Sequence, residues 1–435
     1  MSSNWRVGIL KDLVTLQRGH DLPERDRNPG SVPVMGSAGH NGFHNKALVN
    51  GPGIVIGRSG ASFGQVHFCQ QDYWPHNTAL YVTNFQGNDP SFVYYYLKNI
   101  DFARFNSGSA QPSLNRNYIY PIPVQIPSVE IQRKISEIIC SLDRKIELNR
   151  QMNQTLEAMA QAIFQSWFVD FEPVKAKQKA KAAGKSAAYI EMAAIVALSG
   201  KSEDAIRELS AEVRSGLAEI AGLFSDELVE SELGLIPEGW EVKNLGGLTN
   251  YLQRGIQPKY LDEGGVLVIN QKCIRDRQIN IEKARRHDQL KKAINDRELR
   301  LGDILVNSTG TGTLGRIAQV LYLAETTIVD SHITIVRPNP DSATVHYLGL
   351  NLIRREAEVE SLGRGSTGQT ELSRSSLDSL AVVLPCIRLQ NRFDDQVSGL
   401  RDKIIANELQ SKTLAELRDS LLPKLLSGEL TLPAA

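Results

Sequence analysis

The stretch from about Ser128 to Val169 places the strongest constraint on what this chain folds into. Its apolar residues recur every three or four positions, which keeps them on one face of a helix. Proline is absent between Val129 and Phe171, so nothing breaks the helix. Roughly 42 residues at about 1.5 Å per residue make a helix of about 60 Å. A helix of that length cannot bury its apolar face against itself, so it requires a second long helix.

The second long helix is predicted within the same chain, because the first one is repeated near the C-terminus. The residues from Leu142 to Asn149 (LDRKIELN) reappear from Leu400 to Asn407 (LRDKIIAN), at an offset of 258 positions (400 − 142 = 258). The matching heptad rows are Ile135, Leu142, Asn149, Leu156 and Ile163 in the first helix and Phe393, Leu400, Asn407, Leu414 and Leu421 in the second. Since the same offset also relates Gln132 to Gln390, we infer that the chain consists of two copies of one unit.

A turn-rich segment with short strand-like runs precedes each predicted helix. The letters LQRG occur at Leu16–Gly19 and again at Leu252–Gly255, whereas the sequence between such shared landmarks differs almost completely. We therefore predict two modules of one fold that recognise two different things. The predicted boundaries are 1–126 for the first module, 127–171 for the first long helix, 172–236 for a partly helical connector, 237–384 for the second module and 385–435 for the second long helix.

Composition and charge limit the class of protein. The 435 residues exceed one ordinary core, and no apolar run approaches the ~20 residues of a membrane span. The N-terminal residues lack a secretory apolar core, and the four cysteines form no CxxC pair, which suits a reducing, cytoplasmic location. Because the formal net charge is zero, a DNA-binding role needs locally segregated charge or partners that share the phosphate contacts. The lysine run 175–181 is interpreted as a solvated face, with a phosphate-contacting arm as the alternative.

The sequence contains one match to a dinucleotide-binding motif, at Gly310–Gly315 (GTGTLG). The residues that follow, Arg316 to Tyr322, favour a strand, whereas that motif needs a helix. H-E-x-x-H, G-x-S-x-G and amino-methyltransferase loops do not occur, and the eight histidines do not cluster at metal spacing. We therefore predict no catalytic residue, no metal site and no cofactor bound by this chain itself.

Taken together, the repeat and its landmarks resemble the specificity subunit of Type I restriction-modification systems. The segments that carry the resemblance are Gly108–Asn115 (GSAQPSLN), Ile122–Gln132 (IPVQIPSVEIQ), Gln165–Phe171 (QSWFVDF), Ser231–Trp240 (SELGLIPEGW) and Leu422–Gly428 (LPKLLSG). They are spread over essentially the whole chain, and only the connector over 172–223 is atypical.

This resemblance implies an α+β fold, in which two pseudo-symmetric α/β target recognition domains are separated by two long antiparallel helices that form a coiled coil. It implies that each domain recognises one half of an asymmetric, gapped sequence in double-stranded DNA. It further implies that two modification (methyltransferase) subunits and restriction (ATP-dependent translocase and nuclease) subunits dock on this non-catalytic chain. S-adenosylmethionine, ATP and Mg²⁺ would belong to those partners, and the complex would be a DNA adenine methyltransferase and a Type I deoxyribonuclease.

The predicted DNA contacts lie on loops at matching positions of the two modules, because glycines let the backbone approach DNA while Arg, Asn and Gln read base edges. In the first module these residues are Arg58, Ser59, Ser62, Ser109 and Gln111. In the second module they are Asn307, Ser308, Thr309, Thr311, Arg364, Thr367 and Gln369. The alternative for each of them is ordinary turn chemistry. Landmarks shared by both modules are also candidates for contacts with phosphate or with a partner subunit.

Ten basic residues crowd positions 272–300 of the second module only. We predict that this cluster, which begins with Lys272, Arg275 and Arg277, is a phosphate surface that supplies salt-sensitive affinity.

Asn149 and Asn407 occupy the middle of their heptad rows, where a polar pair would weaken packing but fix the register of the helices. The alternative is that either side chain faces solvent or a partner subunit. A coiled-coil assembly scaffold that never contacts DNA is the competing function, and it leaves two divergent modules without a purpose. An enzyme with its own methyltransferase or nuclease domain is the other competitor, and the missing motifs argue against it.

Overall fold

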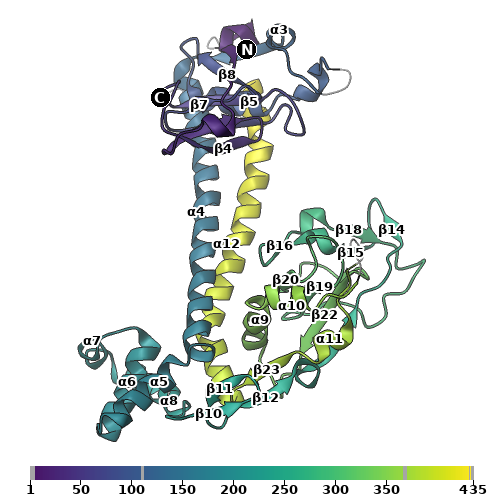
Figure 1. The fold of residues 1–435 in the computed structure, drawn as a ribbon. Coiled ribbons are helices and arrows are strands. Elements are labelled where there is room, and N and C mark those ends of the chain that lie inside the picture. The colour runs from purple at the N-terminus through teal and green to yellow at the C-terminus, as the bar shows by residue number, and fades with distance from the viewer. Residues whose placement is uncertain (1–4, 109–111, 366–369, 431, 433–435) are drawn as a thin grey trace. The chain divides into compact units, whose positions relative to one another are not determined.

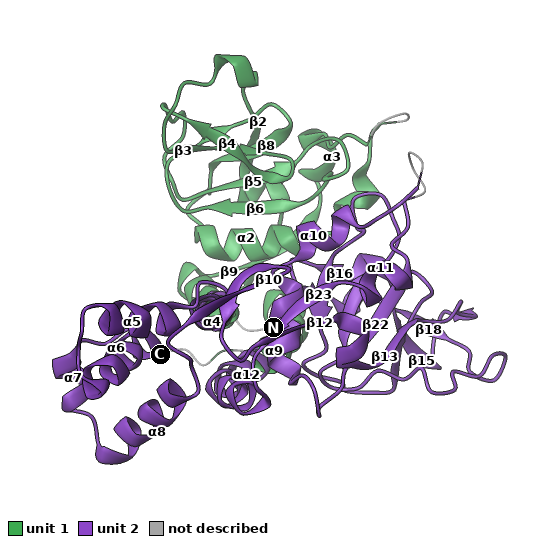
Figure 2. Cartoon of the chain, turned by 60° about the horizontal axis from the view of Figure 1, so that its bottom comes forward, with its two compact units in different colours: residues 1–150, 408–435 green, residues 151–407 purple. Residues whose placement is uncertain are grey.

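The computed structural model describes residues 5–108, 112–365, 370–430 and 432. The chain divides into two compact units: unit 1 comprises Met1–Arg150 with Glu408–Ala435, and unit 2 comprises Gln151–Asn407 (Figure 2). Two long helices, α4 (Val129–Phe168) and α12 (Ile387–Ser427), contribute to both units (Figure 1). The prediction of two long helices at matching positions of the repeat is confirmed.

Unit 1 is built around a four-stranded antiparallel sheet with the strand order β2-β8-β5-β6. A three-stranded sheet, β4-β3-β7, and a two-stranded pair, β1-β9, complete its strands. The strands are β1 (Trp5–Ile9), β2 (Thr15–Arg18), β3 (Val32–Gly36), β4 (Gly39–His44), β5 (Gly53–Gly57), β6 (Val66–Cys69), β7 (Trp74–Pro75), β8 (Ala79–Asn84) and β9 (Pro123–Pro127). The short helices are α1 (Leu10–Leu13), η1 (Glu24–Asp26), α2 (Pro90–Lys98), η2 (Phe102–Phe105) and α3 (Arg116–Ile119).

Strand β5 explains why the sheet of unit 1 has apolar residues on both of its faces. Alternate side chains of a strand point to opposite faces, and Ile54 and Ile56 join one core while Val55 joins another with Tyr81. All five residues of β5 are buried. A strand that is covered on both faces is a continuous apolar run, as the letters GIVIG are.

Unit 2 contains the equivalent four-stranded sheet, with the order β13-β22-β19-β20, and a further sheet, β14-β18-β15-β21. The strands are β10 (Leu228–Ser231), β11 (Gly234–Pro237), β12 (Glu241–Asn244), β13 (Thr249–Arg254), β14 (Tyr260–Leu261), β15 (Val266–Ile269), β16 (Ile274–Arg275), β17 (Gln278–Ile279), β18 (Arg285–His287), β19 (Ile304–Asn307), β20 (Ile317–Gln319), β21 (Thr327–Val329), β22 (Ile333–Pro338) and β23 (Ala381–Leu384). The short helices of the second module are η3 (Leu245–Leu248), η4 (Gln271–Cys273), η5 (Ile281–Lys283), α9 (Val345–Ile353), α10 (Glu356–Ser361) and α11 (Arg374–Asp378). The residues after Gly315 form strand β20, as predicted, and not the helix of a dinucleotide site.

The cores of the two modules are closed by equivalent positions of the long helices. In unit 1 the start of α4 contributes Ile135 and Ile139, and the end of α12 contributes Leu422, Leu425 and Leu426. In unit 2 the start of α12 contributes Phe393 and Val397, and the end of α4 contributes Phe164, Trp167 and Phe168. Each of these residues in one unit lies 258 positions from its counterpart in the other. The pseudo-symmetry predicted from the sequence therefore extends to the cores.

The two long helices run antiparallel in each unit. In unit 1, Asp143 of α4 contacts Arg418 of α12, and Asn149 contacts Gln410, so the partner number falls as the α4 number rises. In unit 2, Asn153 contacts Asn407, and Glu157 contacts Arg401. Two α/β modules with a pair of long antiparallel helices make up the predicted fold class, which is confirmed.

The connector forms four helices, α5 (Glu172–Ala182), α6 (Ala187–Ser199), α7 (Glu203–Arg207) and α8 (Ala211–Gly222). Ala194, Ile195, Ile206 and Ala221 form a small core of their own among these helices. The lysine run is only partly a solvated face. Lys177 donates to the carbonyl oxygen of Phe224 at 2.6 Å, and Lys181 forms ion pairs with Asp226 and Glu227.

Candidate nucleic-acid interface

In unit 1, two loops that are far apart in the sequence meet at one edge of the central sheet. Strands β2 and β5 are both antiparallel to β8, so both end at this edge. The loop after β5 begins with Arg58, whose carbonyl oxygen accepts a hydrogen bond from the backbone N–H of Leu114 at 2.8 Å. Ser59 and Ser113 form an isolated β-bridge. The predicted residues Arg58, Ser59 and Ser62 thus share one edge with the second predicted loop.

Unit 2 holds the corresponding loops together in the same way. The backbone N–H of Leu372 donates to the carbonyl oxygen of Ser308 at 2.8 Å, and Thr309 forms a β-bridge with Glu371. Thr311 and Arg364 are exposed, while the Thr309 hydroxyl lies 2.7 Å from Nδ1 of His332. The sequence prediction placed these loops at matching positions, and the structure gives the hydrogen bonds that join them.

Two predicted DNA contacts are corrected by the structure, because Asn307 and Ser308 have no exposed surface. The Asn307 amide donates to the carbonyl oxygens of Gln271 and Thr313 at 3.0 and 3.1 Å. The Ser308 hydroxyl contacts the Thr334 hydroxyl at 2.5 Å. Both side chains hold the loop onto the sheet and present no atom to a ligand. Four further predicted residues, Ser109, Gln111, Thr367 and Gln369, lie outside the described residues.

The basic cluster of the second module contains side chains of two kinds. Lys272 and Arg275 are exposed, although Arg275 also lies 3.5 Å from the Asp276 carboxylate. Arg277 is directed elsewhere: its guanidinium donates to the Gln161 side chain of α4 at 2.9 Å and lies 3.8 Å from Glu356. Its place in the β16–β17 hairpin explains this, because Asp276 and Arg277 both have positive φ in the two-residue turn. Arg277 therefore contacts the long helix, and its contact with phosphate stays a prediction.

Other members of the cluster are also engaged within the protein. Arg286 forms an ion pair with Glu325, and Arg297 donates to the carbonyl oxygens of Arg254 and Gly255 at 2.8 and 3.2 Å. Lys283 and Arg300 are exposed like Lys272. The surface available for phosphate is therefore smaller than the ten basic residues of the sequence indicated.

A buried glutamine anchors each module to its long helix, and sequence reasoning did not select it as a site residue. Gln132 accepts from the backbone N–H of Asp89 at 2.8 Å and donates to the carbonyl oxygen of Pro127 at 3.0 Å. Gln390 repeats both hydrogen bonds with Thr344 and Pro385, at 2.9 and 2.8 Å. The sequence feature that could have identified these two glutamines is the offset of 258 positions that relates them.

The two heptad asparagines are buried within the helix pair, with exposed fractions of 0 % for Asn149 and 2 % for Asn407. In unit 1, Asn149 donates to the side chains of Gln410 and Ser411 at 2.9 and 3.2 Å. In unit 2, Asn407 donates to the Asn153 side chain at 2.8 Å. The solvent-facing alternative is thereby removed for both, and their role in setting the helix register stays a prediction.

The sequence matches the model of a known protein family over both modules. The model of the Type I restriction modification DNA specificity domain matches residues 2–158 and 237–417. The chain belongs to this family. Because the two matches cover both modules together with most of the two long helices, the chain is a specificity subunit with two specificity domains.

Curated relatives and a solved structure agree with the family. The chain is 32% identical over 337 residues to the Type I restriction enzyme HindI specificity subunit of Haemophilus influenzae, covering 73% of this chain and 71% of the relative. It is 23% identical over 394 residues to the MjaIX specificity subunit of Methanocaldococcus jannaschii, covering 87% of this chain and 78% of the relative. The crystal structure of the Type I restriction-modification S subunit from M. genitalium has the same fold, with a TM-score of 0.59 at 13% identity, over 100% of this chain and 98% of that one.

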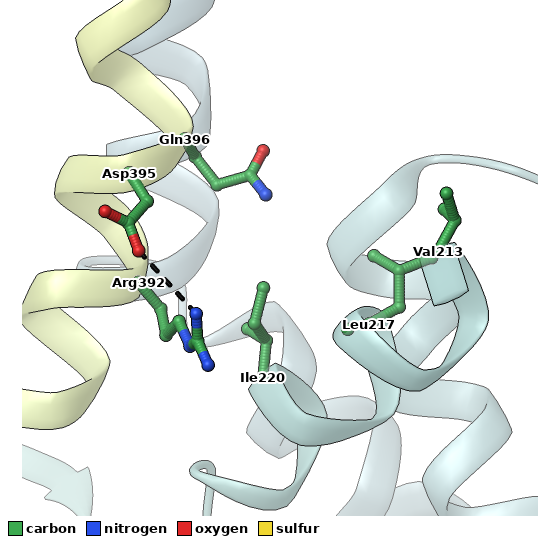
Figure 3. A pocket seen from close by; sticks show the side chains of 7 residues that line it. Val213, Leu217, Ile220, Arg392, Asp395 and Gln396 are labelled. Atoms are coloured by element: carbon green, nitrogen blue, oxygen red, sulfur yellow. Dashed lines mark ion pairs between the residues drawn. The ribbon is translucent and has the colours of Figure 1, made fainter. Parts of the chain in front are cut away.

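The connector of this specificity subunit lies between the two matched regions and packs on α12 within unit 2. A groove of about 270 Å³ separates α8 from α12 and is lined by Val213, Leu217 and Ile220 on one side and Arg392, Asp395 and Gln396 on the other (Figure 3). Beside the groove, Arg392 pairs with Glu219 of α8 at 2.6 Å. In the described parts of the chain, His, Cys, Asp and Glu side chains do not gather in threes as a metal site. None of the described helices is long and apolar enough to cross a membrane.

Proposed function

We propose that each module of this specificity subunit recognises one half of an asymmetric, gapped sequence in double-stranded DNA. The observation that supports this most is that the two modules attach the same pair of loops by the same hydrogen bond, Leu114 to Arg58 and Leu372 to Ser308. The residues that surround these loops differ. Both units have a second sheet whose central strand forms one antiparallel and one parallel pair, β4-β3-β7 in unit 1 and β18-β15-β21 in unit 2, but unit 2 adds strand β14 and the β16–β17 hairpin. A constant framework with divergent surroundings suits two modules that recognise two different base sequences.

The residues that we propose for contact with DNA are those predicted ones that the structure leaves accessible. In unit 1 they are Arg58, Ser59 and Ser62, and in unit 2 they are Thr309, Thr311, Arg364, Lys272, Arg275 and Arg277. Arg364 and Lys272 are exposed and carry the charge that phosphate contacts require. The side chains of Ser59 and Thr309 are short, so they place the loop backbone close to DNA and leave base contacts to the longer side chains.

The long helices would set the distance between the two half-sites and dock two modification subunits, with restriction subunits joining the complex. S-adenosylmethionine, ATP and Mg²⁺ would be held by those partners, so that the complex acts as a DNA adenine methyltransferase and an ATP-dependent deoxyribonuclease in the cytoplasm. The buried anchors Gln132 and Gln390 support this, because each accepts a hydrogen bond from the N-terminus of a short helix of its module and so ties the module to a fixed point on a long helix. A module held at a fixed point can specify a gap length.

The test is to co-express the full chain with its neighbouring modification subunit and to map methylated bases over the host genome by long-read sequencing. We expect a two-part, gapped motif that vanishes when this chain is omitted. If methylation is unchanged without the chain, the DNA-recognition function is wrong and the coiled-coil scaffold is the better account.

A further inference from the structure

The LQRG repeat places an arginine at the same point of each module. Arg18 ends β2 opposite Leu80, and Arg254 ends β13 opposite Thr334. The glycine that follows is required for close packing in both copies. A Cβ atom on Gly19 would lie 2.2 Å from the carbonyl oxygen of His76, and one on Gly255 would lie 2.1 Å from that of Val329. Because the backbone is fixed in the same way, Arg18 and Arg254 occupy equivalent positions in the two modules.

In unit 2 this arginine is neutralised within the protein. The Arg254 guanidinium lies 2.5 Å from the Glu371 carboxylate and donates to the carbonyl oxygen of Leu372 at 2.8 Å. Glu371 belongs to the loop that is joined to Ser308, so the ion pair also closes this edge of the sheet. The carboxylate compensates the charge of this arginine, and both contacts occupy its N–H donors, so its attraction for a phosphate is weak.

In unit 1 the same position is open, because Ser113 stands where unit 2 has Glu371. Both residues form the β-bridge to the loop after the central strand, Ser113 with Ser59 and Glu371 with Thr309. Arg18 is exposed, and its guanidinium forms no ion pair or hydrogen bond with any residue that the structure describes. The residue that pairs with the loop after the central strand is therefore a serine in unit 1 and a glutamate in unit 2.

Two further arginines reach the open edge of unit 1. Arg116, at the start of α3, is exposed and donates to the carbonyl oxygen of Leu16 at 2.9 Å, next to Arg18 on β2. Arg58 follows β5 and contacts the carbonyl oxygen of Asn77 at 3.4 Å. None of these three guanidiniums is paired with a carboxylate of the described residues. In unit 2 the counterpart of Arg116 is the exposed Arg374, while Ser308 replaces Arg58.

We propose that Arg18 and Arg116 form a binding site for DNA phosphate at this edge of the first module, and that Glu371 closes the same site in the second. This inference rests on the proposed DNA-binding function and assigns residues beyond it. Guanidinium groups bind phosphate oxygens through two parallel hydrogen bonds. A pair of them beside the recognition loops fixes the position of the backbone while the loops meet the bases. The two modules therefore contribute unequally to the salt-dependent part of DNA affinity.

The experiment measures how the affinity of the full chain, bound to its modification subunit, depends on salt, with a duplex that contains the mapped target. Each lost phosphate contact makes the plot of log K against log salt concentration shallower by about 0.9. We expect Arg18→Ala and Ser113→Glu each to make the slope shallower by about one unit, on target and non-target DNA alike. Ser113→Gln, which adds the same bulk without charge, serves as the control and keeps the slope.

The second module provides the reciprocal test. Glu371→Ser copies the residue of unit 1 and should make the slope steeper by about one unit, because it frees Arg254 for phosphate. Arg254→Ala should leave the slope unchanged, and thermal unfolding checks that each variant is folded. If Arg18→Ala and Arg254→Ala change the slope equally, or neither changes it, the site is wrong even though DNA is bound. Loss of all salt-dependent binding by the unaltered complex would instead contradict the proposed function.

Discussion

Beside each glutamine anchor, a hydrogen bond between a hydroxyl and a carboxylate joins the module to its long helix. The module supplies the carboxylate in unit 1 and the hydroxyl in unit 2. In unit 1 the carboxylate belongs to Asp89, which caps α2, and it accepts from the Ser136 hydroxyl of α4 at 2.7 Å. In unit 2 the hydroxyl belongs to Thr344, which precedes α9, and it donates to Asp394 of α12 at 2.7 Å. Ser136 and Asp394 are 258 positions apart. The comparison teaches that the repeat preserves an interaction at this place and not the residues that make it.

The helix pairs differ in a related way. An ion pair crosses from α4 to α12 in each unit, Asp143 with Arg418 in unit 1 and Glu157 with Arg401 in unit 2. Arg401 is nearly buried, with 5 % of its side chain exposed, whereas Arg418 has 20 % exposed and keeps a second partner in Asp419. The acidic residue comes from α4 and the arginine from α12 in both units. The offset of 258 aligns Asp143 with Arg401, so one repeated position carries an acidic residue in α4 and an arginine in α12. The two pairs should therefore contribute unequally to stability.

The largest expected effect comes from Glu157→Ala, which leaves the buried Arg401 charge without its carboxylate. Breaking a buried pair in this way costs about 3–5 kcal/mol. Asp143→Ala should cost about 1–3 kcal/mol, because Arg418 keeps Asp419 and only the Tyr95 hydroxyl loses its acceptor. Urea-induced unfolding of the full chain, with hydrogen exchange of α4 and α12 peptides, measures both. Equal losses would show that burial does not distinguish the two pairs.

The next effect tests whether the glutamine anchors are equivalent. Gln132→Leu and Gln390→Leu each leave a helix-cap N–H and a proline carbonyl oxygen without their buried partner. Unsatisfied buried groups cost about 1–3 kcal/mol each, so both variants should lose about 2–4 kcal/mol. Hydrogen exchange should report the opening of α2 in one case and α9 in the other. A loss confined to one unit would contradict the equivalence of the anchors.

A smaller effect is expected when the Asp89–Ser136 pair of unit 1 is changed into the threonine–aspartate pair that Thr344 and Asp394 form in unit 2. Asp89→Thr alone should cost about 1 kcal/mol, since it removes the carboxylate that caps α2 and binds Ser136. Adding Ser136→Asp restores a hydroxyl–carboxylate pair and should recover most of that loss. The matched control is Ser136→Asp alone, which places two carboxylates together and should destabilise. Unfolding free energies of the three variants decide whether the interaction is what the repeat preserves.

The smallest effect on stability is expected when leucine replaces both heptad asparagines, because the lost hydrogen bonds are offset by apolar packing. If Asn149 and Asn407 fix the register, the double variant should stay folded but methylate targets with more than one gap length. Long-read methylation maps of the co-expressed complex measure this. A single, unchanged gap length would assign the register to other residues of the helix pair.

The long helices, the repeat and the strand after Gly315 could be predicted from the sequence, because helical periodicity and turn chemistry are local signals. The burial of Asn307 and Ser308 could not, since it depends on contacts with Gln271 and Thr334, which are distant in the sequence. The hydrogen bond from Arg277 to Gln161 of α4 could not be predicted for the same reason, because the two residues are distant in the sequence.

The loops that are joined by hydrogen bonds lie where the two modules share landmarks in the sequence, and DNA contact by these loops stays a prediction. The hydroxyl–carboxylate pairs at Ser136 and Asp394 and the ion pair of Arg254 could not be predicted from the sequence, because they depend on the three-dimensional neighbours of each repeated position. The sequence repeat therefore identified equivalent loops, whereas the contacts showed which of their side chains are buried or paired within the protein.

The central claim is that the two modules recognise separate half-sites, and exchanging one module tests it most directly. Residues 1–126 would be replaced by the corresponding module of another specificity subunit, and methylated bases would be mapped after co-expression with the modification subunit. The account predicts that one half of the gapped motif changes, while the other half and the gap length stay the same. A motif that changes in both halves, or in neither, would contradict it.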